Sequence, residues 1–208
     1  MTKLYYTATS CGAASFMAAK ASGLTLEAEE IDLSTHRTKV GDVDFYSINP
    51  KGNVPTVVTD DGTVINENVA TLSYIGDLKK DNPLFPSDPS KRAQVINALA
   101  YIATEWHQTI GQLFNPMLSK GVQDHFRAVV AKKLTYMNDH LLKDKTFIAG
   151  DDITVADFYA VVTLSWPGYL GVDLSPYPVV EAYFKTVCAH PFVTDAKEAM
   201  ATSPTTTN

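Results

Sequence analysis

The sequence predicts a mixed α/β domain followed by an all-helical domain, and three observations support this. Strand-like and helix-like segments alternate through the first 80 residues. Three prolines then interrupt residues 81–89, and after them every apolar pattern repeats at helical spacing. We therefore expect an α/β domain over residues 1–80, a linker over 81–89 and a helical domain over 90–208.

The composition is that of a folded protein without a basic surface. Of 208 residues, 45% are hydrophobic, which separates the chain from disordered proteins. The net charge of −6 argues against nucleic-acid and membrane partners, since both favour basic chains. Two cysteines are too few for a disulfide framework, and the start shows no secretory signal. We expect a cytoplasmic protein.

The α/β domain begins as strand, helix, strand. Residues 3–6 are rich in β-formers, and 7–12 are small and polar, as in a turn. Residues 13–22 form an Ala-rich helix that Gly23 ends, and 24–33 fit a second strand with a bulge.

A hairpin and a helix follow. The pattern predicts, in order, a polar loop at 34–42, a helical turn at 45–48, a proline loop at 49–55, strands at 56–59 and 64–66, and a helix at 67–79. Asp60-Asp61-Gly62 is a strong hairpin signal between the two strands. The order is βαβ, connector, ββα, which gives a small mixed sheet covered by helices.

The second half of the chain is predicted to be helical throughout. Apolar spacing places helices at 90–118, 122–142, 154–170, 176–188 and 191–200. The polar tail at 202–208 is expected to fray. Thr154 and Asp157 form a variant of the capping box at the start of one helix.

Val54-Pro55 stands directly before a predicted strand. The spacing alone is compatible with an ordinary trans bond at a sheet edge. The alternative is a cis bond, which occurs in roughly 5% of X–Pro bonds. A cis bond would turn the N–H and C=O of Val54 towards an extended ligand.

The βαβ–Pro–ββα order is the layout of thioredoxin-like domains, and this likeness implies the cis form of the Val54–Pro55 bond. With this order, the sequence resembles the cytosolic glutathione transferases over nearly its whole length. The matching pieces are KLYYTATSCGAAS, INPKGNVPTV, INENVATLSYI, the Pro-rich linker and ITVADFY. The bacterial beta class is the most similar branch, because it has a cysteine after the first strand. The resemblance implies a homodimer that uses glutathione as co-substrate and adds it to small hydrophobic electrophiles.

Cys11 lies in the turn before the first helix. A lone cysteine is often a small buried hydrophobe, but a helix N-terminus would lower its thiol pKa below about 8.5. No second cysteine follows at C-x-x-C spacing, so disulfide exchange would need glutathione as the second thiol. The resemblance implies that Cys11 faces the glutathione sulfur, with Ser10 as the rival and Tyr6 as another hydroxyl donor.

The resemblance also implies a set of glutathione-binding residues. A helix start such as Glu67-Asn68 can bind a carboxylate, although favourable charge on the first turn explains Glu67 by itself. The family holds the γ-glutamyl end there, usually with serine where this chain has Asn68. The beta class has a glycyl-binding lysine where this chain has His36, and Arg37 could substitute for it. The remaining residues of this set are Val54, Pro55, Lys51 and Asn53.

Four residues of the helical half complete the expected site. His107 follows Trp106 on a helix face, where a packed histidine is the ordinary interpretation. The resemblance implies that His107 points to Cys11, where it would donate to a thiolate or shuttle a proton. Phe114, Trp166 and Tyr169 are either core or walls of a hydrophobic cleft.

Three functions remain open at this stage. The first is glutathione conjugation, and the second is thiol transfer with Cys11 as covalent nucleophile. The third is a non-enzymatic binding role on the same fold. No metal-ligand spacing and no phosphate-binding glycine motif is present in the sequence, so we expect no metal.

Overall fold

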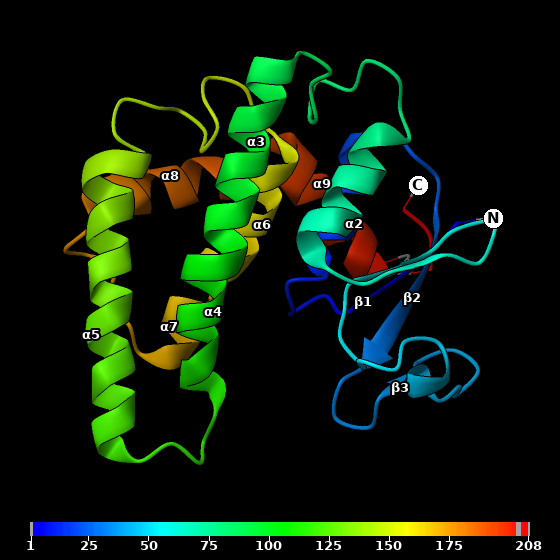
Figure 1. Ribbon diagram of the computed structural model, residues 1–208, viewed down its shortest axis with the longest axis horizontal. Coiled ribbons are helices and arrows are strands. Elements are labelled where there is room, and N and C mark those ends of the chain that lie inside the picture. The colour runs from blue at the N-terminus through cyan, green and yellow to red at the C-terminus, as the bar shows by residue number, and fades with distance from the viewer. Residues whose placement is uncertain (1, 203–204, 208) are drawn as a thin grey trace. The chain divides into compact units, whose positions relative to one another are not determined.

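The computed structural model describes residues 2–202 and 205–207, which form two compact units (Figure 1). The first unit combines the chain up to residue 87 with the chain from residue 189 onward, and the second is residues 88–188. The last predicted helix therefore groups with the first unit, whereas the sequence pattern had assigned it to the helical domain.

The first unit contains a five-stranded mixed sheet in the order β3-β2-β1-β4-β5. Its strands are β1 (Lys3–Tyr6), β2 (Glu27–Asp32), β3 (Arg37–Thr38), β4 (Thr56–Val58) and β5 (Val64–Ile65). β1 pairs with β2 in parallel and with β4 in antiparallel orientation. The predicted order is confirmed, except that β3 lies within the expected polar loop. Two residues are too few for a periodic signal.

Both faces of this sheet carry packed side chains. Its helices are α1 (Ala13–Ala21), the 3₁₀ turn η1 (Phe45–Ser47), α2 (Asn68–Asp77) and α9 (Pro191–Thr202). Successive strand residues face opposite sides. Tyr6 therefore packs on Phe16 of α1, with ring centroids 4.9 Å apart, while Tyr5 packs on Phe45 of η1 at 5.6 Å.

The C-terminal segment is tied to the first unit by backbone pairing. The Thr207 hydroxyl accepts the Leu26 N–H at 2.8 Å, and the Thr205 carbonyl accepts the Ala28 N–H at 2.8 Å. Helix α9 contacts α1. The expectation of a frayed tail is therefore wrong for residues 205–207, because they continue the sheet edge. Residues 203, 204 and 208 lie outside the described part of the chain.

The second unit is helical, and its longer helices are interrupted where one continuous helix was expected. It comprises α3 (Pro89–Tyr101), the π-helical η2 (Ile102–His107), α4 (Gln108–Gly111), the 3₁₀ turn η3 (Gln112–Phe114), α5 (Lys120–Tyr136), the π-helical η4 (Met137–Leu141), α6 (Val155–Leu164), α7 (Trp166–Leu170) and α8 (Pro178–Cys188). A π-helical turn changes the hydrogen-bond partner by one residue and leaves the apolar spacing nearly intact, so the pattern did not reveal it. No helix among the described residues is long and apolar enough to cross a membrane.

Helix α6 is the centre of the helical unit. All its residues are buried, and it contacts α3 and α8. The predicted capping box is confirmed, since the Thr154 N–H donates to Asp157 at 2.8 Å. Asp157 also accepts the Ile148 N–H at 2.8 Å and the Tyr183 hydroxyl at 2.7 Å. This buried carboxylate thus joins a loop, a helix start and α8.

Candidate functional site

Cys11 lies in the turn that leads into α1, against the proline loop of residues 49–55. Its Sγ donates to the Val54 carbonyl over 3.4 Å, and the Val54–Pro55 bond is cis, as the resemblance implied. Gly12 permits this close packing, because a Cβ there would lie 3.3 Å from the Tyr6 Cα and 3.4 Å from the Pro55 nitrogen.

The Cys11 thiol is protonated at neutral pH. Burial raises its pKa to about 12, because the thiolate would lose hydration, and the negative charge of Glu67 acts in the same direction. The expected lowering of the pKa is therefore wrong: hydrogen bonds from the backbone N–H groups of Cys11 and Gly12 do lower it, but desolvation outweighs them. Cys11 offers its surroundings an S–H donor.

The two rival hydroxyls differ in their surroundings. Ser10 is partly buried, and its Oγ donates to the Thr7 carbonyl at 3.1 Å while it accepts the Gly12 N–H at 3.2 Å. Tyr6 is fully buried in the packing against Phe16, and burial raises its pKa well above the usual value for tyrosine. Tyr6 is a core residue, which corrects the expectation that its hydroxyl takes part in catalysis.

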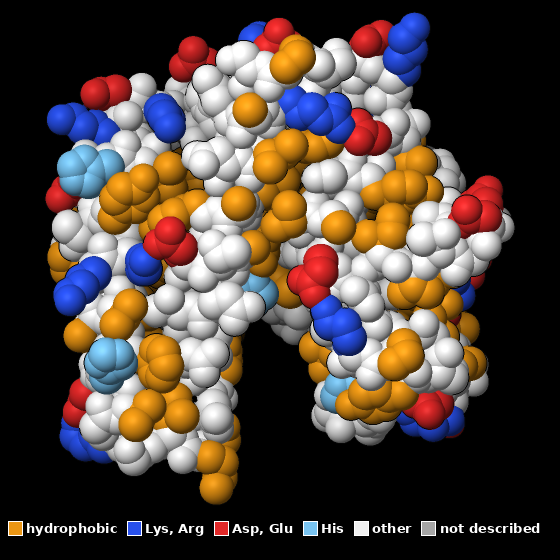
Figure 2. Space-filling view, in the orientation of Figure 1, with side chains coloured by type: hydrophobic (Ala, Val, Ile, Leu, Met, Phe, Trp, Pro, Cys, Tyr) orange, Lys and Arg blue, Asp and Glu red, His pale blue; other side chains and the backbone are white. Residues whose placement is uncertain are grey.

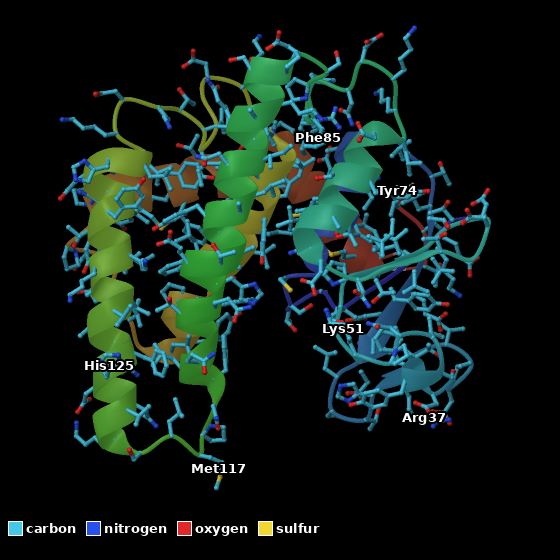
Figure 3. The ribbon with its side chains drawn as sticks, viewed as in Figure 1. Arg37, Lys51, Tyr74, Phe85, Met117 and His125 are labelled. Atoms are coloured by element: carbon cyan, nitrogen blue, oxygen red, sulfur yellow. The ribbon has the colours of Figure 1, made fainter. Side chains whose placement is uncertain are left out.

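The start of α2 brings Glu67 and Asn68 to the same region, with different surroundings. Glu67 is the N-cap residue, its side chain makes no capping bond, and it pairs with Lys51. Figure 3 shows Lys51 near this end of α2, and at the same place in Figure 2 a basic side chain touches an acidic one. The Asn68 amide is buried and donates to the Cys11 carbonyl at 3.1 Å. The Asn68 side chain thus positions the Cys11 turn, where it was expected to meet a ligand carboxylate.

Three asparagines hold the proline loop in place. Asn49 is fully buried and donates to Asn53 Oδ1 at 2.9 Å. Asn53 in turn donates to the Asn66 carbonyl at 2.7 Å, and Asn66 donates back to Asn49 at 2.8 Å. The side chain of Asn53, expected to bind ligand, is therefore committed to the loop. The sequence analysis missed this network, and its one sign was the repeated asparagine around a strand.

His36 lies in the loop after β2, where its ring packs against an aromatic side chain. Its ring stacks on Tyr46 at 4.7 Å with an interplanar angle of 17°. Gly52 has φ of +67°, and a Cβ there would lie 2.5 Å from the Tyr46 ring, so only glycine fits beneath the stack. The Arg37 guanidinium donates to both the carboxylate and the backbone carbonyl of Asp42, and Figure 3 shows Arg37 away from Lys51.

In the helical unit, His107 lies in the π-helical segment η2 and is partly buried. Its Nδ1 is 2.6 Å from the Tyr159 hydroxyl of α6. Burial lowers its pKa, because the imidazolium would be poorly hydrated, so the ring is neutral at neutral pH. Tyr159 was missed in the sequence analysis. Its one sign was a hydroxyl group on a buried helix that is mostly apolar.

An aromatic group adjoins His107. Trp166 is buried and meets the His107 ring edge-on at 4.8 Å, and Phe114 meets Trp166 at 5.5 Å. Phe114 is half-exposed, and Tyr169 on α7 is 81% exposed. Phe114, Trp166 and His107 therefore form one continuous aromatic surface. Among the described residues no cluster of His, Cys, Asp or Glu could hold a metal ion.

Comparison with known proteins finds one family over both parts of the chain. The model of the glutathione S-transferase N-terminal domain matches residues 1–77, and that of the C-terminal domain matches residues 119–191. The glutathione S-transferase GstA of Escherichia coli O157:H7 is 35% identical over 198 residues, which cover 95% of this chain and 98% of the relative.

Solved structures of similar proteins have the same fold. A glutathione transferase from Methylococcus capsulatus str. Bath superposes with a TM-score of 0.90 at 35% identity, covering 97% of this chain and 99% of the other. A sphingomonad glutathione S-transferase complexed with glutathione gives 0.89 at 31% identity, covering 97% and 100%. A beta-class enzyme from Sphingomonas chungbukensis gives 0.87 at 34% identity, covering 95% and 98%. Two matched domain models and a relative so similar over nearly the full length show that this protein belongs to the glutathione S-transferase family.

Proposed function

We propose that this protein transfers the glutathione thiolate to small hydrophobic electrophiles. Family membership supplies glutathione as the co-substrate, as in the sphingomonad relative solved with glutathione. The observation that carries the choice of reaction is the position of the Cys11 thiol, whose Sγ lies 3.4 Å from the Val54 carbonyl in surroundings that raise its pKa by burial. A protonated thiol in that position can donate a hydrogen bond to the glutathione sulfur, but it is itself a poor nucleophile.

The proposed reaction is a substitution or an addition at an electrophilic carbon. Glutathione loses its thiol proton to solvent, and its sulfur then forms a C–S bond. With an aryl halide, the carbon–halogen bond breaks and the halide ion leaves with the bonding electrons. The protein accelerates this step by holding the two reactants together and by stabilising the thiolate with directed donors.

Glutathione is assigned to the first unit in an extended form. Its backbone pairs with Val54, its ammonium group with Glu67, and its γ-glutamyl carboxylate with the backbone N–H groups that begin α2. The exposed Glu67 carboxylate supports this, since its Lys51 partner is also half-exposed and exchangeable. His36 and Lys51 are assigned to the glycyl carboxylate.

Of Cys11 and Ser10, Cys11 is the better hydrogen-bond donor to the glutathione thiolate. An S–H···O bond is weak, so Cys11 can redirect its proton at little cost. The Ser10 hydroxyl already takes part in two hydrogen bonds within its own turn, since it donates to the Thr7 carbonyl and accepts the Gly12 N–H. His107 is assigned a second donor role towards the sulfur, and Phe114, Trp166 and Tyr169 are assigned to the electrophile.

The raised pKa of Cys11 also indicates which of the two reactions, conjugation or thiol transfer, is faster. At pH 7 a thiol with pKa near 12 is ionised in on the order of one molecule in 10⁵. Thiol transfer needs Cys11 itself as the attacking thiolate, whereas conjugation needs only its S–H bond. Conjugation is therefore the main reaction, and thiol transfer by Cys11 is a slow side reaction.

Steady-state assays with two substrates test the proposal. We expect the parent protein to conjugate an aryl halide readily and to reduce a glutathione mixed disulfide slowly. Cys11→Ala should lower kcat for conjugation about tenfold, while Ser10→Ala changes it less than threefold. A parent protein that mainly reduces the disulfide would reverse the ranking. Tight glutathione binding in calorimetry with neither activity would show a non-enzymatic protein.

The proposal includes a cytoplasmic homodimer. The family resemblance implies the dimer, and light scattering on the eluted protein should give twice the chain mass of 22.7 kDa. A mass of 22.7 kDa at micromolar concentration would contradict it. Cell fractionation should recover the activity with the cytoplasmic enzymes, and recovery with membranes or the medium would contradict that assignment.

A further inference from the structure

The ring of His107 is enclosed by groups from α6 and α7. The Tyr159 hydroxyl lies 2.6 Å from Nδ1, and the Tyr159 ring stands at 88° to the imidazole. Trp166 packs against the same imidazole at 4.8 Å with an angle of 69°. Nδ1 is thus already occupied, and Nε2 is the nitrogen left for a further partner.

The chemistry of the two groups decides which of them donates. A neutral imidazole holds one N–H and one lone pair, and burial lowers the pKa of His107, which keeps the ring neutral. The phenol is the stronger acid of the two neutral groups, and an imidazole nitrogen is the stronger base. The separation of 2.6 Å between Nδ1 and the Tyr159 oxygen is a hydrogen-bond distance, so one of the two groups donates to the other. The Tyr159 proton therefore points at Nδ1.

The support behind Tyr159 is rigid. Tyr159 is 2% exposed, and all of α6 is buried. The capping residue Asp157 is two positions away and accepts four hydrogen bonds. The Tyr159 carbonyl also accepts the Thr163 hydroxyl at 3.0 Å. A side chain anchored in this way can impose a fixed orientation on the ring that it touches.

We infer that Tyr159 is a positioning residue: its hydroxyl donates to Nδ1 and holds His107 in the tautomer that carries its proton on Nε2. Its consequence for catalysis rests on the role proposed above for His107. An Nε2–H group can donate to a glutathione thiolate and cannot accept the proton of a glutathione thiol. His107 thus stabilises the nucleophile and does not act as the base that generates it.

Nitrogen NMR of the histidine-labelled full chain tests the tautomer directly. The His107 signals are assigned by their loss in His107→Gln. We expect a protonated Nε2 and an unprotonated Nδ1 in the parent at pH 7.5. In Tyr159→Phe, both tautomers should be populated. Tyr177→Phe is the matched control, because it removes a hydroxyl contact to the Ala131 carbonyl in the same unit, and its spectrum should equal that of the parent.

A protonated Nδ1 in the parent would overturn the inference. This measurement needs only the parent protein, so it tests the inference even if Tyr159→Phe does not fold. An unchanged tautomer in folded Tyr159→Phe would overturn it as well. Kinetics separate this result from the proposed function. Tyr159→Phe should lower kcat for an aryl halide about threefold to tenfold with a nearly constant KM for glutathione, and should cause no further loss in His107→Gln. If His107→Gln keeps parent activity, the catalytic role of His107 fails while the tautomer assignment stands.

Discussion

The carboxylates at the starts of helices α6 and α2 have opposite surroundings, and the chain uses them in opposite ways. At the start of α6, Asp157 is fully buried and accepts hydrogen bonds from Ile148, Thr154 and Tyr183. At the start of α2, the Glu67 side chain is 69% exposed, makes no capping bond and pairs with the half-exposed Lys51. The same functional group is structural in one place and available in the other.

The difference shows how to separate scaffold from site within one chain. A buried carboxylate must be satisfied by the protein, so its removal leaves several donors without an acceptor. An exposed carboxylate at a helix start is hydrated, so a ligand cation can replace its present partner at low cost. The first should control stability and the second should control binding. Three predictions test this division.

The largest expected effect is on folding. Asp157→Ala should lower the free energy of unfolding by about 3–5 kcal/mol, because it strands buried donors as well as removing a helix cap. Urea denaturation followed by circular dichroism measures it, with a lower midpoint at unchanged slope. Asp151→Ala, at an exposed position of the preceding loop, is the control and should match the parent. Equal midpoints for all three proteins would refute the structural role of Asp157.

The second expected effect is on glutathione binding. Glu67→Gln should raise KM for glutathione about tenfold, since it removes the charge assigned to the ligand ammonium. Its free energy of unfolding should change by less than about 0.5 kcal/mol, as for other exposed ion pairs. Glu181→Gln breaks the exposed pair with Lys185 on α8 and serves as control. A loss of stability without a change in KM would show that Glu67, like Asp157, has a structural role and does not bind the ligand.

The smallest expected effect links Glu67 to its neighbour. Cys11 should react slowly with iodoacetamide, and its rate should still rise about tenfold per pH unit at pH 10, because its pKa is raised to about 12. An ordinary thiol reaches its plateau near pH 9–10. Since the thiolate is less stable in the folded than in the unfolded chain, the same shift makes folding stability fall as pH rises from about 9 towards 12.

Glu67→Gln should increase the Cys11 rate severalfold at pH 8, because it removes the repulsion that adds to desolvation. Cys188→Ser isolates the Cys11 signal, and mass spectrometry of the labelled peptide measures it. A plateau below pH 9 would show that the helix N-terminus outweighs burial after all.

The features predicted correctly from the sequence are those with a local cause. The capping box needs only Thr154 and Asp157 three residues apart, and the hairpin needs only Asp60-Asp61-Gly62. The cis Val54–Pro55 bond came from the family resemblance, because local spacing favoured trans. The frayed tail was a wrong expectation, since its pairing partner is Ala28, far away in the chain.

By itself, the sequence determined the order of most strands and helices and the family to which the chain belongs. These follow from periodicity, turn residues and motif order, which act over a few neighbouring residues. The tertiary structure alone showed that burial raises the pKa of the Cys11 thiol and that Asn68 donates to the Cys11 carbonyl. It also showed that Asn53 donates to the Asn66 carbonyl and that the Tyr159 hydroxyl lies beside Nδ1 of His107. Desolvation and hydrogen-bond partnership depend on residues that are distant in sequence and close in space, so no local pattern carries them.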